Sequence, residues 1–152
     1  MEYEIREVKH ENKSYYHSIV ADGCGITVAI SEHFCERLVW RMASLGIFHN
    51  EDACQYVLNA LFVQSEMGDY LLWEIPCDNE VRCFLVIDKK NDIIYVVRKK
   101  GDEIVIKTSL SPYKRVIAYD PGDILLCVEK SGSVRETSEE EEPRFVCKVK
   151  TE

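Results

Sequence analysis

Three polar side chains in the segment ISEHFCERLVWRM (residues 30–42) have the types and the spacing of a phosphate-handling site. His33, Arg37 and Arg41 are four residues apart, so on a helix all three project from one face. Histidine titrates near neutral pH and transfers protons, and arginine binds phosphate through a bidentate fork while keeping its charge. Trp40 lies beside the row, and its indole can stack on a nucleobase. The row therefore predicts metal-independent phosphodiester cleavage.

The same spacing also fits the solvent-facing side of an ordinary amphipathic helix. In that interpretation Arg37 pairs with a nearby carboxylate, such as Glu32 or Glu36, and His33 caps the helix or packs against it. The two interpretations differ in where the side chains point. A catalytic row must open into a cleft shared with other polar groups, and a solvated row lies on a flat surface.

A second polar group lies at the end of the segment EIVIKTSL (103–110), which alternates like a strand. Lys107, Thr108, Ser109 and Tyr113 lie within a few residues of one another there, and we expect them to form a candidate site group. Alternation places Lys107 and Ser109 on one face of the strand and Thr108 on the other. The alternative is a polar edge strand whose lysine and threonine keep the sheet soluble.

Two further residues would join this group if their strands presented the same face, namely Tyr95 as a phenol and Glu74 as a carboxylate. The local basic patches are RKK (98–100) and YKR (113–115). The first is expected in a solvated strand end and turn. If the helical row faces the sheet near these patches, an RNA strand can pass between them.

Hydrophobic periodicity divides the rest of the chain into predicted elements. Ser31 is expected to cap a helix, and Gly46 is expected to end it. Strands are expected at 3–9, 14–21, 26–30, 69–76, 81–88, 93–100, 103–110, 124–130 and 144–150, and helices at about 32–45 and 49–62.

The predicted fold class is α+β, with two consecutive helices packed against an antiparallel β-meander. An N-terminal hairpin-like segment precedes the helices, with its turn at 22–25, and a C-terminal strand ends the chain. We expect a single domain, 1–152. The segment 131–143 has almost no apolar residues and is predicted to be a mobile acidic loop.

Composition restricts the classes of function. The chain has 152 residues, of which 46% are hydrophobic and 30% charged, as in ordinary globular proteins. Its net charge of −8 argues against a general duplex-DNA binder. No dinucleotide fingerprint, P-loop, zinc-protease motif or serine-hydrolase elbow occurs, so we expect no cofactor.

The seven cysteines include no CxxC pair, so reduced, mostly buried thiols are expected, and no metal. A scattered cysteine–histidine metal site is the alternative. No apolar run is long enough to span a bilayer, and the charged N-terminal segment does not have the pattern of a secretory signal. We therefore expect no membrane partner and a cytoplasmic location.

The order of these elements, with SEHFCERLVWR on the first helix and VIKTSL at the end of the meander, resembles a fold group of small ribonuclease toxins. The group contains barnase, EndoU, the tRNA-cleaving colicins and the RelE-type interferases. The resemblance covers roughly residues 28–112 and is nearest to an uncharacterised family with a His…Arg…Arg helix. It implies RNA as the partner, proton transfer by His33, phosphate binding by Arg37 and Arg41, and a supporting role for Thr108 or Ser109.

A different class of function remains open. The acidic chain could be an interaction protein without catalysis, either phage-encoded or associated with a toxin, that occupies a basic protein partner. Glu139–Glu142 would then act as a docking segment. Salt-sensitive binding without a nuclease product would favour this alternative. The oligomeric state is not predicted by the sequence.

Overall fold

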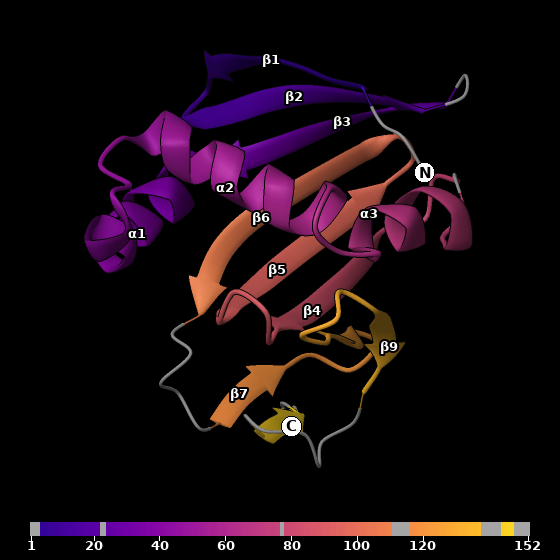
Figure 1. Cartoon of the computed structure of the whole chain (residues 1–152). Coiled ribbons are helices and arrows are strands. Elements are labelled where there is room, and N and C mark those ends of the chain that lie inside the picture. The colour runs from indigo at the N-terminus through magenta and orange to yellow at the C-terminus, as the bar shows by residue number, and fades with distance from the viewer. Residues whose placement is uncertain (1–3, 22–23, 77, 111–115, 138–143, 148–152) are drawn as a thin grey trace.

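One large β-sheet organises the protein, and its strands come from both halves of the chain (Figure 1). The computed structural model describes residues 4–21, 24–76, 78–110, 116–137 and 144–147. The described strands are β1 (Glu4–Glu11), β2 (Ser14–Ala21), β3 (Cys24–Ser31), β4 (Arg82–Asp88), β5 (Ile93–Lys100), β6 (Glu103–Leu110), β7 (Val116–Tyr119), β8 (Ile124–Val128), β9 (Val134–Glu136) and β10 (Arg144–Cys147).

The large sheet has the spatial order β1-β2-β3-β6-β5-β4-β8-β9, and most neighbouring strands are antiparallel. Two pairs, β3–β6 and β4–β8, are parallel. The chain between β3 and β6 includes two helices, which is long enough for the crossover that a parallel pair requires. The last strand, β10, pairs with β7 in a separate parallel sheet. The predicted α+β class and the mostly antiparallel sheet are confirmed.

Helical segments cover one face of the sheet (Figure 1). They are α1 (Glu32–Met42), the 3₁₀ turn η1 (Ala43–Leu45), α2 (Asn50–Phe62), α3 (Met67–Asp69) and the π-helical η2 (Tyr70–Glu74). Ser31 caps α1 as predicted, because its Oγ accepts a hydrogen bond from the Phe34 amide at 3.1 Å. Gly46 ends the helical segment in the left-handed conformation, at φ 79°.

The prediction of a strand at residues 69–76 is wrong, because this segment is helical through α3 and η2. Leu71 and Leu72 are both buried, as is Ile75, while Trp73 and Glu74 are exposed. Adjacent buried side chains fit one face of a helical turn, whereas a strand would alternate them between two faces. The antiparallel meander therefore consists of β4, β5 and β6.

The N- and C-terminal predictions are confirmed in outline. β2 and β3 pair as an antiparallel hairpin from Ser14↔Ser31 to Ala21↔Cys24, and β10 lies inside the expected C-terminal strand. Within 131–143, residues 134–136 form β9, which pairs with β8. Residues 138–143, including the predicted docking glutamates, lie outside the described residues.

The two faces of the sheet differ in what packs against them. The face under the helices carries the main core, with Val28, Tyr95, Val97, Ile104 and Ile106 buried against α1 and α2. On the opposite face, Leu85, Ile87, Ile94 and Leu125 form a smaller buried cluster over β4, β5 and β8, with Tyr119 of β7 packed against it. We call this second face the open face, because its part over β2, β3 and β6 carries exposed side chains.

In the described part of the chain, no helix is both long enough and apolar enough to cross a membrane.

A buried histidine makes the stability of this core sensitive to pH. His17 of β2 is 1% exposed and lies on the helix-covered face, with its ring nitrogens 3.9 and 4.0 Å from the Sγ of Cys54 in α2. Burial disfavours the charged imidazole and lowers the pKa of His17 from 6.5 to about 4.

We predict that the free energy of unfolding falls as the pH is lowered from about 6.5 to about 4, because the unfolded chain then binds a proton that the folded chain excludes. The loss attributable to His17 is about 3 kcal/mol. Urea titrations across this range should show a shallower dependence for His17→Leu than for wild type. The matched control His49→Leu, at an exposed histidine, should keep the wild-type dependence. Parallel pH curves for wild type and His17→Leu would contradict the assignment.

Candidate functional site

The candidate site is built on a junction between α1 and the end of β6. Since β3 and β6 run parallel, both strands end at the same edge of the sheet. Ser31, the last residue of β3, donates a hydrogen bond from Oγ to the backbone oxygen of Lys107 at 2.5 Å. The same Oγ caps α1. The first turn of α1, which carries His33, is therefore attached to the strand that carries Lys107.

His33 lies near a carboxylate on its own helix. Its side chain is 61% exposed, and Nδ1 lies 4.0 Å from Oε2 of Glu36, one turn along α1. This distance is longer than a hydrogen bond and both side chains are exposed, so the contact is a weak surface ion pair that forms only with the protonated imidazole. The sequence alternative assigned Glu32 or Glu36 to Arg37, but Glu32 pairs with Nε2 of His10 at 2.7 Å and Glu36 pairs with His33.

Arg37 and Trp40 project from the solvent-facing side of α1. Arg37 is exposed and has no hydrogen bond or ion pair in the part of the chain that the structure describes. Trp40 is 89% exposed, which is unusual for an indole, since large aromatic side chains are normally well covered. An unpaired guanidinium beside an uncovered aromatic ring gives this surface the groups needed to bind a phosphate and a base.

Arg41 lies at the other end of the row and is half-buried. Its Nη2 donates to the backbone oxygen of Asp92 at 3.2 Å, in the turn between β4 and β5. Its Nη1 is buried and has no hydrogen-bond partner within the described residues. Arg41 therefore anchors α1 to the sheet with one nitrogen and retains an unused donor on the other.

A buried polar cluster fixes the turn that receives Arg41. Asp88, which is 1% exposed, accepts hydrogen bonds from the amides of Lys90 and Asn91 at 3.0 and 3.1 Å. Its Oδ2 also accepts from the Asn91 side chain at 2.9 Å and from the Tyr95 hydroxyl at 3.1 Å. Burial, and then the Asp88 charge, raise the pKa of Tyr95 well above its usual value, so Tyr95 stays a protonated donor.

The second predicted polar group is only partly assembled. Lys107 is exposed on the open face, while Tyr95 lies buried on the helix-covered face and stacks on Phe34 with ring centroids 6.2 Å apart. Glu74 is exposed on η2 rather than on a strand. Tyr95 and Glu74 therefore do not share a face with Lys107.

Three predicted residues have side chains that lie outside the described ones. The backbone of Thr108 and Ser109 belongs to β6, where Ser109 is opposite Tyr95, but their side chains are not described. Tyr113 lies entirely outside the described residues. The structure thus brings His33, Arg37, Trp40 and Arg41 together on α1, whereas the side chain of Lys107 lies on the opposite face of the sheet and only its backbone joins the start of the helix.

The hollows between described residues are lined by other side chains, so neither of them is the shared cleft that the catalytic interpretation of the row requires. One, of about 520 Å³, lies between β1 and α2 and includes Ile5, Asp52 and Asn59 in its lining. Another, of about 330 Å³, lies beside the end of α2 and includes Glu66, Asp69 and Ser131. Among the described residues, no group of three or more His, Cys, Asp or Glu side chains converges to hold a metal ion.

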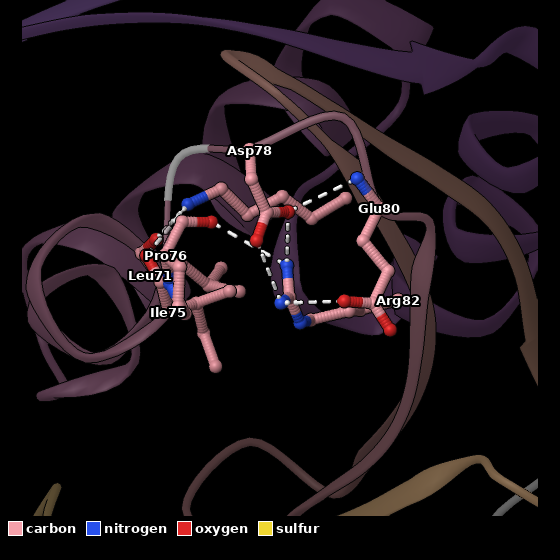
Figure 2. A network of polar contacts seen from close by, with 7 residues as sticks. Leu71, Ile75, Pro76, Asp78, Glu80 and Arg82 are labelled. Atoms are coloured by element: carbon pink, nitrogen blue, oxygen red, sulfur yellow. Dashed lines mark hydrogen bonds and ion pairs between the residues drawn. The ribbon is translucent and has the colours of Figure 1, made fainter.

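A second polar network lies under η2 and was missed by sequence reasoning (Figure 2). Lys99 was assigned to a solvated basic patch, and that prediction is wrong, because Lys99 is 2% exposed. Its Nζ donates to the backbone oxygens of Leu71 at 2.6 Å and Ile75 at 3.4 Å. A cation is thereby placed at the end of a helical segment, where carbonyls lack helical partners and the dipole is negative.

The adjacent loop is held by an arginine fork. Arg82 donates to both carboxylate oxygens of Asp78, at 2.7 and 3.0 Å, and to Glu80 at 3.1 Å (Figure 2). The hydrogen bonds from Arg82, and then the one from the Glu80 amide, lower the pKa of Asp78 below its usual value, and the charge of Lys99 adds a smaller contribution. A sequence signal existed, because Lys99 has the strand parity of buried Tyr95 and Val97. The contacts of this network indicate a structural role.

Comparison of the chain with protein-family models, with curated proteins and with solved structures found no match. The assignment of function therefore rests on the geometry of α1 and its surroundings.

We predict that Ser31→Ala lowers the free energy of unfolding by about 1–2 kcal/mol, because the mutation removes the cap of α1 and a hydrogen bond to β6. The control Ser31→Thr keeps a hydroxyl and should recover most of the loss. Urea unfolding measures both variants. If Ser31→Ala were as stable as wild type, the junction would not contribute to stability.

We also predict that Lys99→Met lowers the free energy of unfolding by about 1–3 kcal/mol, since it leaves two carbonyl oxygens without their donor. The neighbouring exposed lysine provides the control, and Lys100→Met should change stability by less than about 0.5 kcal/mol. Thermal and urea unfolding should agree. Equal stability of the two variants would reject the role of Lys99 as a cap.

Proposed function

We propose that this protein cleaves RNA without a metal, using the exposed face of α1. The observation that carries the proposal is the exposure of the row: His33 lies on the exposed face of α1, and the Arg37 side chain lies there without an ion pair, beside the uncovered ring of Trp40. The alternative in which a carboxylate neutralises Arg37 has no support among the described contacts. The resemblance of the sequence to ribonuclease toxins is consistent with the proposal.

In the proposed reaction, Nε2 of His33 accepts the proton of a ribose 2′-hydroxyl. The 2′-oxygen attacks the adjacent phosphorus, and the bond from phosphorus to the 5′-oxygen breaks. The departing 5′-oxygen takes a proton from solvent, which reaches this exposed site. The products are a 2′,3′-cyclic phosphate and a 5′-hydroxyl end, so atoms and charge balance.

The remaining residues of the row bind and orient the RNA. Arg37 binds the scissile phosphate through its fork, and Arg41, whose Nη1 is buried, adds positive charge at the end of the row rather than a direct contact. Trp40 stacks on a flanking base. Lys107 adds positive charge at the junction with β6, and Thr108 and Ser109 of that strand remain proposed contributors, as does Tyr113, which lies outside the described residues.

We predict that His33→Ala lowers the rate of RNA cleavage by about 10²–10⁴-fold, which is the contribution of a positioned general base. The stability should not change, because His33 is exposed. The control is His49→Ala, at an exposed histidine whose side chain makes no capping hydrogen bond, and it should retain wild-type activity. Cleavage of a labelled oligoribonucleotide in the presence of EDTA measures both variants.

Two results would reject the catalytic assignment. One is equal cleavage by His33→Ala and His49→Ala. The other is complete loss of wild-type cleavage in EDTA with recovery on adding a divalent cation. Salt-sensitive binding of a basic protein, with no RNA product from any variant, would instead support the alternative of an acidic interaction protein.

A further inference from the structure

The open face of the sheet carries an ordered set of small, polar and aromatic side chains. Directly opposed residues on neighbouring strands point to the same face of a sheet. One row therefore runs Tyr16–Ala29–Val105–Arg98 across β2, β3, β6 and β5. A parallel row runs Ser18–Thr27–Glu103–Lys100 across the same strands. We call the side chains of Tyr16, Ser18, Thr27, Ala29 and Val105 the sheet platform.

Most of the platform is accessible to solvent. Ser18 and Thr27 are exposed, Tyr16 and Val105 are half-buried, and Ala29 between them is buried. The helices lie on the other face of the sheet, and the small cluster under β7 covers β4, β5 and β8 rather than β2 and β3. Short hydroxyl side chains beside a tyrosine ring can donate to sugars, phosphates and base edges while a base stacks on the ring.

Cations border this platform on the side of β5 and β6. The side chains of Arg98, Lys100 and Lys107 are exposed, and they make no hydrogen bond or ion pair within the described part of the chain. On the opposite border, by contrast, Arg6 and Lys9 of β1 pair with Glu4 at 3.0 Å and Glu11 at 3.4 Å. Glu103 is the one described carboxylate on β5 or β6 that shares this face, and it lies opposite Lys100. Unpaired cations in a chain of net charge −8 indicate a local anionic partner.

We propose that the open face binds single-stranded RNA across the platform and leads it around the sheet edge at Ser31 to His33. The proposal rests on the proposed function in taking RNA as the substrate. Strands are about 4.8 Å apart, so β2 to β5 spans about 14 Å, which accommodates one extended strand. A base can stack on Tyr16 only if it is not already stacked within a duplex, which favours single-stranded RNA.

The junction supplies the continuity of this path. Lys107 is the platform cation nearest the edge, and its backbone oxygen accepts the hydrogen bond from Ser31 Oγ. Two residues after Ser31, the chain has turned into α1 and presents His33. An RNA strand bound by Arg98 and Lys107 would thus find Arg37 and the proposed general base, His33, on the adjoining helix.

The test measures binding of a fluorescein-labelled oligouridylate of twelve nucleotides to the full chain by fluorescence anisotropy. A His33→Ala background prevents cleavage during the titration. In that background, Arg98→Glu should weaken binding about tenfold or more at low salt and should reduce the salt dependence. Tyr16→Ala should weaken binding about fivefold or more, whereas Tyr16→Phe keeps the ring and should stay within twofold of the parent.

The matched control is Lys130→Glu, which makes the same change of charge sign at an exposed lysine that follows β8. Binding by this variant should stay within about twofold of the parent. An equal loss for Lys130→Glu and Arg98→Glu would overturn the proposal, because only the net charge would then matter. Equal competition by a polyglutamate peptide would overturn it too, since the face would then select an acidic protein segment rather than RNA.

Failure of this proposal can be separated from failure of the proposed function. If His33→Ala abolishes cleavage while Arg98→Glu and Tyr16→Ala leave binding and KM unchanged, the platform is rejected and the catalytic row stands. If the platform variants weaken RNA binding but the wild-type protein gives no cleavage product, the platform stands and the catalytic row is rejected.

Discussion

The hydroxyl of Ser31 is the interaction on which the arrangement of the candidate site depends. It accepts a hydrogen bond from the Phe34 amide and donates one to the Lys107 carbonyl, so one atom joins β3, α1 and β6. This use of both hydrogen-bonding capacities is possible because β3 and β6 are parallel and end at the same edge. At its other end, α1 is fixed by Arg41 on the Asp92 carbonyl. The helix is thus attached to the sheet at both ends, which fixes the position of its backbone relative to the sheet.

For the binding of an anion, the distribution of charge over the surface matters more than the net charge of the chain. The chain is acidic, yet Arg37, Arg98 and Lys107 are exposed cations without partners in the described structure. Exposed charges interact only weakly beyond the Debye length, which is about 8 Å at physiological ionic strength. An anion close to α1 or to the open face therefore experiences mainly the nearby charges, which are these cations together with Glu36 on α1 and Glu103 on the open face. Carboxylates elsewhere, such as Asp78 in its fork with Arg82, are already paired.

The sequence predicted those parts of the fold that depend on neighbouring residues. The cap at Ser31, the end at Gly46 and the strands β4, β5 and β6 all follow from local periodicity and backbone preference. The helical conformation of 69–76 was missed because the donor that completes it, Lys99, comes from a strand more than twenty residues later. The parallel pairing of β3 with β6 was missed for the same reason, since nothing in either segment specifies a partner so distant in sequence.

In the candidate site too, local spacing predicted which side chains are exposed, but it did not predict their partners. Helical spacing correctly placed His33, Arg37 and Trp40 on the exposed side of α1, but it could not show that Glu36 pairs with His33 rather than with Arg37. Strand parity showed which residues share a face with Lys107, but not that Tyr95 would be buried against Phe34. Partner choice depends on three-dimensional packing, which the spacing of residues on one element does not contain.

The enclosure of Lys99 has a consequence for how the protein can be observed. Its ammonium group is covered by η2 and occupied by two carbonyls, so an acylating reagent reaches the amine only when η2 separates from β5. The rate of acylation at this one amine would therefore report the frequency of that local opening, independently of global unfolding. The exposed lysines of the same chain react with the reagent without any opening. Their acylation rate therefore serves as an internal standard for the rate at Lys99.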